Sequence, residues 1–338
     1  MKYVKENTAS FSVRALGEVD ALVLSWLSYF NYPDSVRGSD GVRICDITCL
    51  PPDMYSDAFN PGKSKKLFER LRLSPRFKDT EMFGFVRETD ESETKQFSAV
   101  TMRLSDGTLF VSFRGTDPSF VGWKENFDLI YRFPLPSQSA ALKYLGGVIE
   151  SNPDAEIYVG GHSKGGNMAV YAASKVKTRD NIKAVYNFDG PGFLRDVSCE
   201  GAVKIVPKAS FVGMLLEKGR DFTVVKSKNV SLLQHDPFSW EVGERGFKTT
   251  KKRTDMSVRL GRAMGKWIDE MGLDERERLI DIVYTALLKL DTRNFNVFFK
   301  TAVKQARALG KEHKRLNESD REFFDEKVRR FKYILKHG

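Results

Sequence analysis

The sequence predicts an α/β fold with a mostly parallel central sheet, helices on both faces of that sheet, and a C-terminal helical subdomain. Between residues 97 and 227, short apolar runs typical of buried strands alternate with helical patterns. That alternation favours a parallel sheet that is covered on both faces. After about residue 250 the strand pattern ends and amphipathic helical segments follow. We therefore expect one α/β domain over residues 1–247 and a helical subdomain over residues 248–338.

The first part of the chain predicts a helix and a hairpin. Residues 18–30 carry apolar side chains at helical spacing, whereas residues 31–80 contain several turn signals and predict short helices only. Residues 97–114 form two alternating apolar runs around Asp106-Gly107. An Asp-Gly pair at this place favours a tight hairpin, because the turn requires positive φ at its central residues. The second run ends in "FRGTDPS", so we expect a strand that leads into a loop.

The middle of the chain predicts strands and helices in alternation. The expected helices are 138–150 and 165–177, with a short helix beginning within 194–200. The expected strands are 156–161, 183–190, 202–207 and 221–227.

The C-terminal region predicts four helices, at 259–272, 274–290, 294–310 and 319–337, with Ser319 and Glu322 as a capping box for the last. Residues 248–338 hold 23 basic and 14 acidic side chains, a net charge of +9, against +1 for residues 1–247. Two interpretations account for this excess of positive charge. The region is either a packing subdomain with solvated charged faces or a surface that docks on an anionic membrane. No nucleic-acid partner is expected, since basic residues alternate with acidic ones instead of forming a stripe.

Composition excludes several classes of protein. There is no run of 18 apolar residues, which argues against a transmembrane helix. The N-terminal residues lack the apolar stretch of a secretory signal, so a cytoplasmic location is expected. The three cysteines are too few for a disulfide framework and have no partners at zinc-ligand spacing. We expect no metal and no cofactor.

Residues 161–165, "GHSKG", match the G-x-S-x-G pattern of a nucleophile elbow. In this motif a serine occupies a tight turn between a strand and a helix, and the glycines keep side chains from colliding around it. The context fits, because a strand-like run precedes Ser163 and a helical run rich in alanine follows it. The alternative, a glycine-rich phosphate loop, lacks the spacing of either known phosphate motif.

A serine nucleophile needs a base and a group that orients the base. Among the four histidines, His162 lies inside the elbow and His313 and His337 lie in the helical tail, which leaves His235 as the candidate base. In hydrolases of this kind the order along the chain is serine, acid, histidine. Asp189 ends a strand beyond the elbow and is the preferred acid, although it could instead cap the Gly-Pro-Gly turn that follows.

Two other carboxylates remain open as the acid. Asp221 opens a predicted strand, which would place it at the opposite edge of the sheet, and Asp236 adjoins His235. The candidate oxyanion hole consists of Thr116, which follows the strand 108–114, and the backbone N–H of Lys164.

With these residues in place, the chain resembles the α/β-hydrolases related to class 3 (fungal-type) lipases, and particularly a bacterial group of class-3-lipase-like proteins. The resemblance rests on "VSFRGTD", "GGHSKGGNMAVYAA", "NFDGPGF" and "LLQHDPFSW", and spans about residues 10–245. It implies Thr116 in the oxyanion segment, Ser163 as nucleophile and His235 as base. Two features depart from the family. The usual position of the acid, one strand later than Asp189, has no carboxylate, and Lys164 replaces an apolar residue.

These observations predict a serine hydrolase that cleaves carboxylic esters, with lipids among the candidate substrates, through Ser163, His235 and Asp189. The charge at Lys164 argues against a deep acyl-chain site. The alternative is a non-catalytic protein of hydrolase fold whose basic helical tail binds a membrane or a partner.

Overall fold

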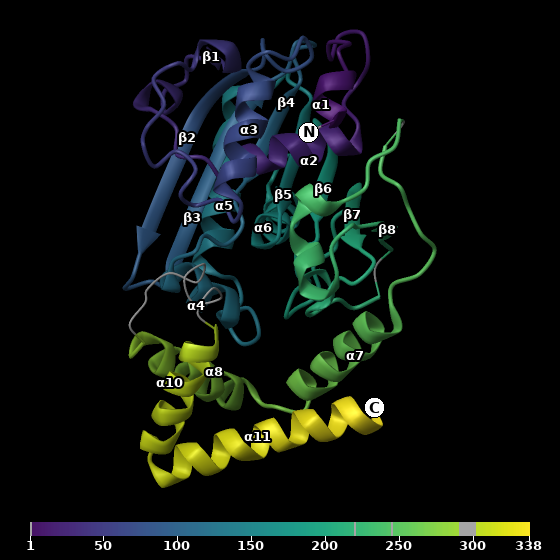
Figure 1. Cartoon of the computed structure of the whole chain (residues 1–338). Helices are drawn as coiled ribbons and strands as arrows, with labels where there is room; N and C mark the ends of the chain where they lie inside the picture. Colours follow the sequence, from purple (N-terminus) through teal and green to yellow (C-terminus); the bar gives the residue numbers. More distant parts are fainter. Residues whose placement is uncertain (1, 220, 245, 291–301) are drawn as a thin grey trace.

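The computed structural model describes residues 2–219, 221–244, 246–290 and 302–338. A sheet of eight strands, with the strands side by side in chain order, runs through the centre of the main body (Figure 1). The strands are β1 (Val42–Arg43), β2 (Glu81–Asp90), β3 (Lys95–Arg103), β4 (Leu109–Phe113), β5 (Ile157–His162), β6 (Ile182–Phe188), β7 (Ala202–Pro207) and β8 (Thr223–Val225).

The first four strands pair antiparallel. The predicted hairpin is confirmed as β3 and β4, and Gly107 in its turn has a φ of +85°. Strand β2 was not predicted. Its register shifts between Phe83 and Val86, and Gly84 at the shift has a φ of +63°. Such a bulge interrupts the alternation of side chains on which strand prediction depends.

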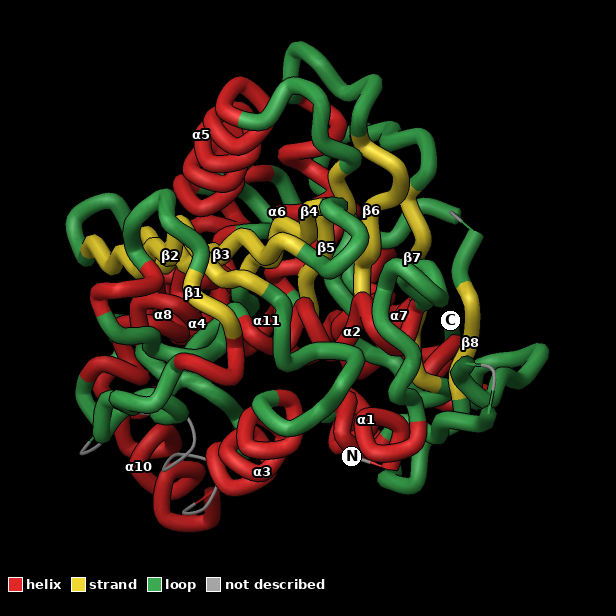
Figure 2. The backbone as a smooth tube through the Cα atoms, turned by 90° about the horizontal axis from the view of Figure 1, so that it is seen from above, coloured by secondary structure: helices red, strands yellow, loops and turns green. Residues whose placement is uncertain are grey.

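Strands β4 to β8 pair parallel, which confirms the α/β fold. Helices α5 (Pro136–Ser151) and α6 (Lys164–Lys175) cover one face of the sheet, and α2 (Glu18–Leu27) and α3 (Pro61–Leu71) cover the other (Figure 2). The predicted helices near 18–30, 138–150 and 165–177 are thus present. The short helix expected within 194–200 is wrong, since those residues form a bend and loop.

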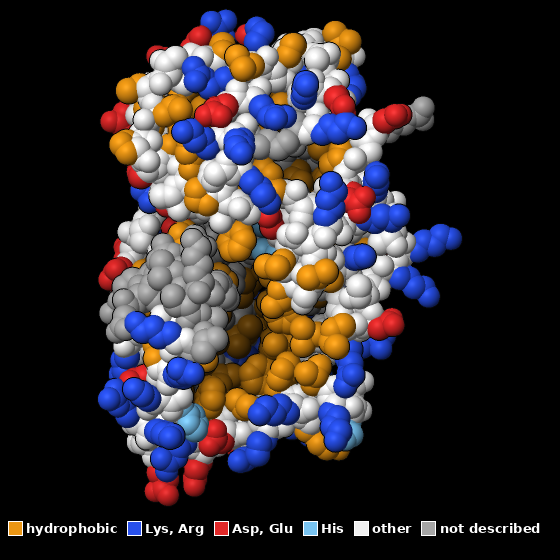
Figure 3. Space-filling model, viewed as in Figure 1, with side chains coloured by type: hydrophobic (Ala, Val, Ile, Leu, Met, Phe, Trp, Pro, Cys, Tyr) orange, Lys and Arg blue, Asp and Glu red, His pale blue; other side chains and the backbone are white. Residues whose placement is uncertain are grey.

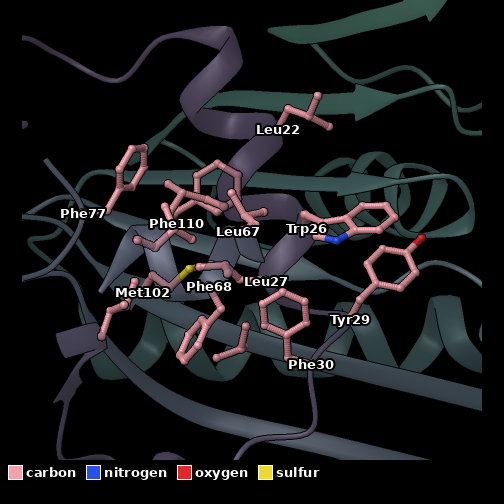
Figure 4. Close-up of a cluster of buried hydrophobic side chains, with 14 of the residues drawn as sticks. Leu22, Trp26, Leu27, Tyr29, Phe30, Leu67, Phe68, Phe77, Met102 and Phe110 are labelled. Atoms are coloured by element: carbon pink, nitrogen blue, oxygen red, sulfur yellow. The ribbon is translucent and has the colours of Figure 1, made fainter. Parts of the chain in front are cut away.

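Each face of the sheet has its own hydrophobic core. Alternate residues of β4 point to opposite sides, so that Phe110 packs with α2 and α3 while Val111 packs with α5 and α6. On the first side, Trp26 and Leu27 of α2 meet Phe68 of α3 (Figure 4). The two cores together hold β5 and the turn that follows it in a fixed position.

Helix α1 (Lys2–Glu6) starts the described chain, and α4 (Phe120–Asp128) follows β4. The C-terminal helices are α7 (Asp255–Asp269), α8 (Leu273–Leu288), α10 (Ala302–Arg315) and α11 (Glu318–His337). They lie beyond the carboxyl ends of the parallel strands, below the sheet in Figure 1. Within the described residues, no helix is both long and apolar enough to cross a membrane.

Three of the four predicted C-terminal helices are confirmed over their described residues. The fourth, 294–310, is confirmed from residue 302 on, and its first part lies outside the described residues. The capping box at Ser319 is wrong. Asn317 is the N-cap of α11, and its side chain accepts a hydrogen bond from the Asp320 N–H. The domain boundary at residue 247 stays a prediction.

Candidate active site

Ser163 lies in the tight turn between β5 and α6, with a φ of 59° and a ψ of −133°. This backbone conformation is strained for a residue other than glycine. The turn requires glycine on both sides of Ser163. A Cβ atom on Gly161 would lie 2.3 Å from the carbonyl carbon of Gly165, and one on Gly165 would lie 2.2 Å from the Phe113 oxygen. The strand, turn and helix that the G-x-S-x-G pattern requires are therefore all present.

His235 and Asp189 are joined by a hydrogen bond. His235 ends the 3₁₀ turn Ser231–His235, and Asp189 directly follows β6. Their Nδ1 and Oδ2 atoms lie 2.6 Å apart. Asp189 is fully buried, and the Ser210 hydroxyl donates to its other oxygen, Oδ1, at 2.5 Å. Both oxygens of this carboxylate are thus engaged, which fixes its orientation toward the imidazole.

The other two candidate carboxylates lie elsewhere. Asp221 is exposed just before β8. Asp236 accepts hydrogen bonds from Asn60 Nδ2 at 2.8 Å and from Lys63 Nζ at 3.2 Å. Asp236 therefore ties the loop after His235 to the start of α3.

Backbone contacts bring Ser163 next to this pair. The Ser163 N–H donates to the carbonyl of Phe188, the residue before Asp189, at 2.9 Å. The ring of His162 lies against that of His235, with centroids 4.6 Å apart. Ser163, Asp189 and His235 therefore share the carboxyl edge of β5 and β6. The exposed fraction is 9% for Ser163 and 28% for the His235 side chain.

His162 contacts both the ring and the backbone of His235. Its Nε2 lies 2.9 Å from the His235 carbonyl oxygen, and its Nδ1 lies 3.2 Å from the Tyr29 hydroxyl. Because a carbonyl only accepts, Nε2 carries the proton, and Nδ1 is then free to accept from Tyr29. Burial, followed by the nearby charge of His235, holds the pKa of His162 well below its usual value of 6.5. His162 is therefore neutral, with both ring nitrogens occupied.

The segment after β4 passes beside Ser163. A Cβ atom on Gly115 would lie 3.1 Å from the Ser163 Cβ. Within the described part of the chain, the buried hydroxyl oxygen of Thr116 has no hydrogen-bond partner. The fully buried Arg114 pairs with Asp57 and, at 3.2 Å, with Asp117. Thr116 is thus held by its neighbours while its own hydroxyl remains available.

The side chain of Lys164 points away from the site. It is completely buried, and its Nζ lies 2.5 Å from Glu125 Oε2 and 3.1 Å from the Gln96 carbonyl oxygen. Glu125 also accepts from the Gln96 and Ser137 backbone N–H groups. The expectation that Lys164 brings charge into the site is therefore wrong. The backbone N–H of Lys164 lies in the first turn of α6, where N–H groups have no acceptor within the helix.

Sequence reasoning missed the contact between α7 and Ser210, the residue that donates to the candidate acid. The Ser257 hydroxyl on α7 donates to the Ser210 carbonyl, and the Thr254 N–H donates to the Lys208 carbonyl at 2.8 Å. Ser210 in turn holds Asp189. No local signal connects residues 47 positions apart in the chain. Among the described residues, no cluster of three or more His, Cys, Asp or Glu side chains offers a metal site.

A protein-family comparison matches residues 71–285 to the Mbeg1-like family. The match covers well over half of the chain and includes Ser163, Asp189, His235, Thr116 and Lys164. It also extends through α7 into α8. A comparison with curated proteins finds no match.

Solved structures that the chain is similar to include three fungal lipases. One is the Rhizomucor miehei lipase propeptide complex, with 16% identity, a TM-score of 0.33, and coverage of 45% of this chain and 58% of that one. Lip2 lipase from Yarrowia lipolytica has 12% identity, a TM-score of 0.37, and coverage of 69% and 82%. The lipase from Rhizopus microsporus var. chinensis has 11% identity, a TM-score of 0.41, and coverage of 71% and 80%. This chain thus spans little more than half of the first. Similarity at these scores carries no argument about activity.

Proposed function

This chain belongs to the Mbeg1-like family, which is class-3-lipase-like and has an α/β-hydrolase fold, and we propose that it is a serine hydrolase that cleaves carboxylic esters. The observation that carries this proposal is the 2.6 Å hydrogen bond between His235 and Asp189, at the sheet edge where Ser163 occupies its strained turn. A histidine that is hydrogen-bonded to a buried carboxylate beside a serine is typical of nucleophilic catalysis.

In the proposed reaction the Ser163 oxygen attacks the ester carbonyl carbon, and His235 Nε2 takes the serine proton. Asp189 holds Nδ1–H and stabilises the imidazolium that forms. The tetrahedral intermediate then breaks its bond to the alcohol, which leaves with the proton from His235. Water repeats these steps on the acyl-enzyme and releases the carboxylic acid.

The negative charge on the intermediate needs preorganised donors. We assign this role to the Thr116 N–H and hydroxyl and to the Lys164 N–H. The unpartnered Thr116 hydroxyl supports the assignment. The start of α6 adds a favourable dipole at the same point. One such donor is worth about 3 kcal/mol of the reaction barrier.

The proposal is tested by turnover of p-nitrophenyl butyrate. Wild-type protein should hydrolyse the ester, and Ser163→Ala and His235→Gln should each lower kcat by about 10⁴-fold or more with little change in stability. Ser151→Ala, at the exposed end of α5, is a matched serine control and should match wild type. Folded wild-type protein that is inert to short esters would contradict the proposal and favour the non-catalytic alternative.

A further inference from the structure

In the described part of the chain, the C-terminal helices contact the main body through α7 and through α8. Near the start of α7, Ser257 donates to the Ser210 carbonyl. At the other contact, α8 packs against α4 (Figure 1 and Figure 2). On the face shown in Figure 3, the surface between these two contacts is hollowed. The contact with α8 bears on the candidate active site, because α4 follows the segment that carries Thr116.

Hydrogen bonds join the Thr116 segment to the start of α4. Ser119 is the N-cap of α4, and its hydroxyl accepts from the Gly122 N–H at 3.1 Å and donates to Asp117, the residue after Thr116. Asp117 also pairs at 3.2 Å with Arg114, two residues before Thr116. The position of α4 therefore determines where the N–H and the hydroxyl of Thr116 lie.

One side of α4 holds the turn that contains the nucleophile. Glu125 is completely buried and accepts from Lys164 Nζ at 2.5 Å. At 100° per residue, Glu125 lies about 200° around the helix from both Trp123 and Phe127, so it faces away from them. The same helix thus contacts both residues that we assign to the oxyanion hole, Lys164 through Glu125 and Thr116 through the cap.

The other side of α4 is aromatic and meets α8. Phe120, Trp123 and Phe127 follow at i, i+3 and i+7, so they share one side of α4. Phe120 is buried in one hydrophobic cluster with Leu287 of α8, and Trp123 and Phe127 pack against that cluster. The α8 residues Val283 and Tyr284 pack against it too. Helix α8 therefore covers the aromatic side of α4.

Polar contacts fix the end of α4 against the same helix. Arg276 of α8 is 9% exposed, and its Nη1 donates at 3.0 Å to the carbonyl of Ile130, two residues after α4 ends. Lys124 Nζ on α4 lies 2.7 Å from Asp128 Oδ1 and 3.4 Å from Asp281 Oδ1 of α8. The contact between the two helices thus extends from the first turn of α4 to the residues that follow it.

Helix α4 depends on such contacts because it is short. It has nine residues, whereas an isolated helix of fewer than about 12 to 15 residues is marginal in water. Without α8, three aromatic side chains would lose their cover, and Glu125 would remain the main buried anchor of α4. A shift of about 1 Å in a catalytic group can cost about a hundredfold in rate. A displacement of α4 should therefore reach Thr116 through its cap and lower the rate.

We propose that α8 is a positioning element for the oxyanion hole, with Leu287 and Arg276 as positioning residues that act through α4. The inference rests on the proposed function, since it adds residues to the machinery of the same site. It gives the C-terminal helices a part in the reaction, which neither a packing role nor membrane docking requires.

The first test is Leu287→Ala in the full-length protein, with p-nitrophenyl butyrate as substrate. We expect kcat to fall about tenfold or more while KM stays within twofold, because the oxyanion donors act on the transition state. Ile334→Ala is the matched control. Ile334 is buried on α11 but lies outside the cluster that joins α4 to α8, so kcat should stay within twofold of wild type.

Binding of a trifluoromethyl ketone separates a positioning role from a purely structural one. The Ser163 oxygen adds to the ketone carbon, the serine proton passes to His235, and the carbonyl oxygen becomes an oxyanion. Affinity for this inhibitor should fall in Leu287→Ala by about the same factor as kcat. Affinity for the matched methyl ketone, which binds without the adduct, should be unchanged.

Hydrogen exchange followed by mass spectrometry tests the contact without any turnover. Peptides that cover residues 116–131 should exchange at least tenfold faster in Leu287→Ala and at the wild-type rate in Ile334→Ala. If Leu287→Ala does not fold, Arg276→Gln takes its place. It lacks the bond to the Ile130 carbonyl, and its kcat should fall about threefold.

Unchanged kcat and unchanged exchange in a folded variant of α8 would overturn the inference, and so would an equal loss in Ile334→Ala. A different result would overturn the proposed function alone. In that case wild type shows neither ester turnover nor the ketone adduct, while exchange over residues 116–131 still rises in Leu287→Ala only.

Discussion

The turn that carries Ser163 and the helices that face it are held in place by different means. Around the turn, ion pairs such as Lys164–Glu125 are completely excluded from water. Between α11 and α7, the pair Arg330–Glu270 is partly exposed, with side-chain exposures of 46% and 31%. Buried polar pairs demand fixed geometry, whereas exposed pairs are screened and tolerate movement. The turn with Ser163 is thus held by an ion pair that water cannot reach, whereas α11 is held against α7 in part by a pair that water can screen.

The largest expected effect is the loss of kcat when the candidate acid, Asp189, is replaced. Asp189→Asn should lower kcat by about 10⁴-fold, because an amide no longer selects the imidazole tautomer that accepts the serine proton. Asp236→Asn is the matched control. It loses a contact to α3 and not to the imidazole, so its kcat should stay within a few-fold of wild type. Steady-state kinetics on a short ester decide the matter, and the reverse ranking would move the acid to Asp236.

The buried and exposed ion pairs should differ sharply in stability. Lys164→Met leaves the Glu125 carboxylate buried without its cation and should cost about 3–5 kcal/mol of unfolding free energy. Adding Glu125→Gln should recover part of that loss, since the amide oxygen can still accept from Gln96 and Ser137.

Arg330→Met is the comparison for the exposed pair and should leave the unfolding midpoint near that of wild type. Urea unfolding followed by circular dichroism measures the stability of the three variants and of the wild type. A Lys164→Met protein as stable as Arg330→Met would show that the elbow does not depend on its buried pair.

A smaller effect is expected at the connection between the two regions. Ser210→Ala removes the hydroxyl that orients Asp189 and should lower kcat by about tenfold, in line with the loss of one hydrogen bond to a charged group. Ser227→Ala removes a buried serine that bonds only to Ser239 and the Asn229 N–H among the described residues, so it should keep near wild-type kcat. Equal kcat values for the two variants would exclude Ser210 from the orientation of Asp189.

The smallest effect concerns pH. His162 is neutral in the folded protein, whereas in the unfolded chain it gains a proton near its ordinary pKa of 6.5. The unfolded state therefore binds more protons below that pH, and stability should fall on acidification by up to about 1.4 kcal/mol per pH unit from this group. His162→Gln should reduce the slope between pH 6.5 and pH 5. An unchanged slope in urea unfolding would mean that His162 is protonated in the folded state.

Local features of the chain were predictable where one stretch contains the whole signal. The turn around Ser163 follows from glycines within three residues of it, and the hairpin follows from Asp106-Gly107. The strand that leads to Asp189 was predicted from its apolar run. The place of His235 after the last strands was predicted from the order of the residues along the chain. Strand β2 was missed because its bulge at Gly84 breaks the alternation.

Long-range contacts were not predictable in the same way. The direction of the Lys164 side chain depends on Glu125, which lies 39 residues away and carries no motif. The position of α7 depends on the hydrogen bond from Ser257 to Ser210, which are 47 residues apart in the chain. Such pairings are decided by packing between elements, and a single sequence contains no periodic signal for them.

The most direct test of the central claim is covalent labelling by a fluorophosphonate, followed by mass spectrometry of the peptides. We predict one adduct on Ser163 of the wild-type protein, slow labelling of Asp189→Asn, and no adduct at this position in Ser163→Ala. Absence of an adduct on folded wild-type protein, or equal labelling of wild type and Ser163→Ala, would contradict Ser163 as the nucleophile.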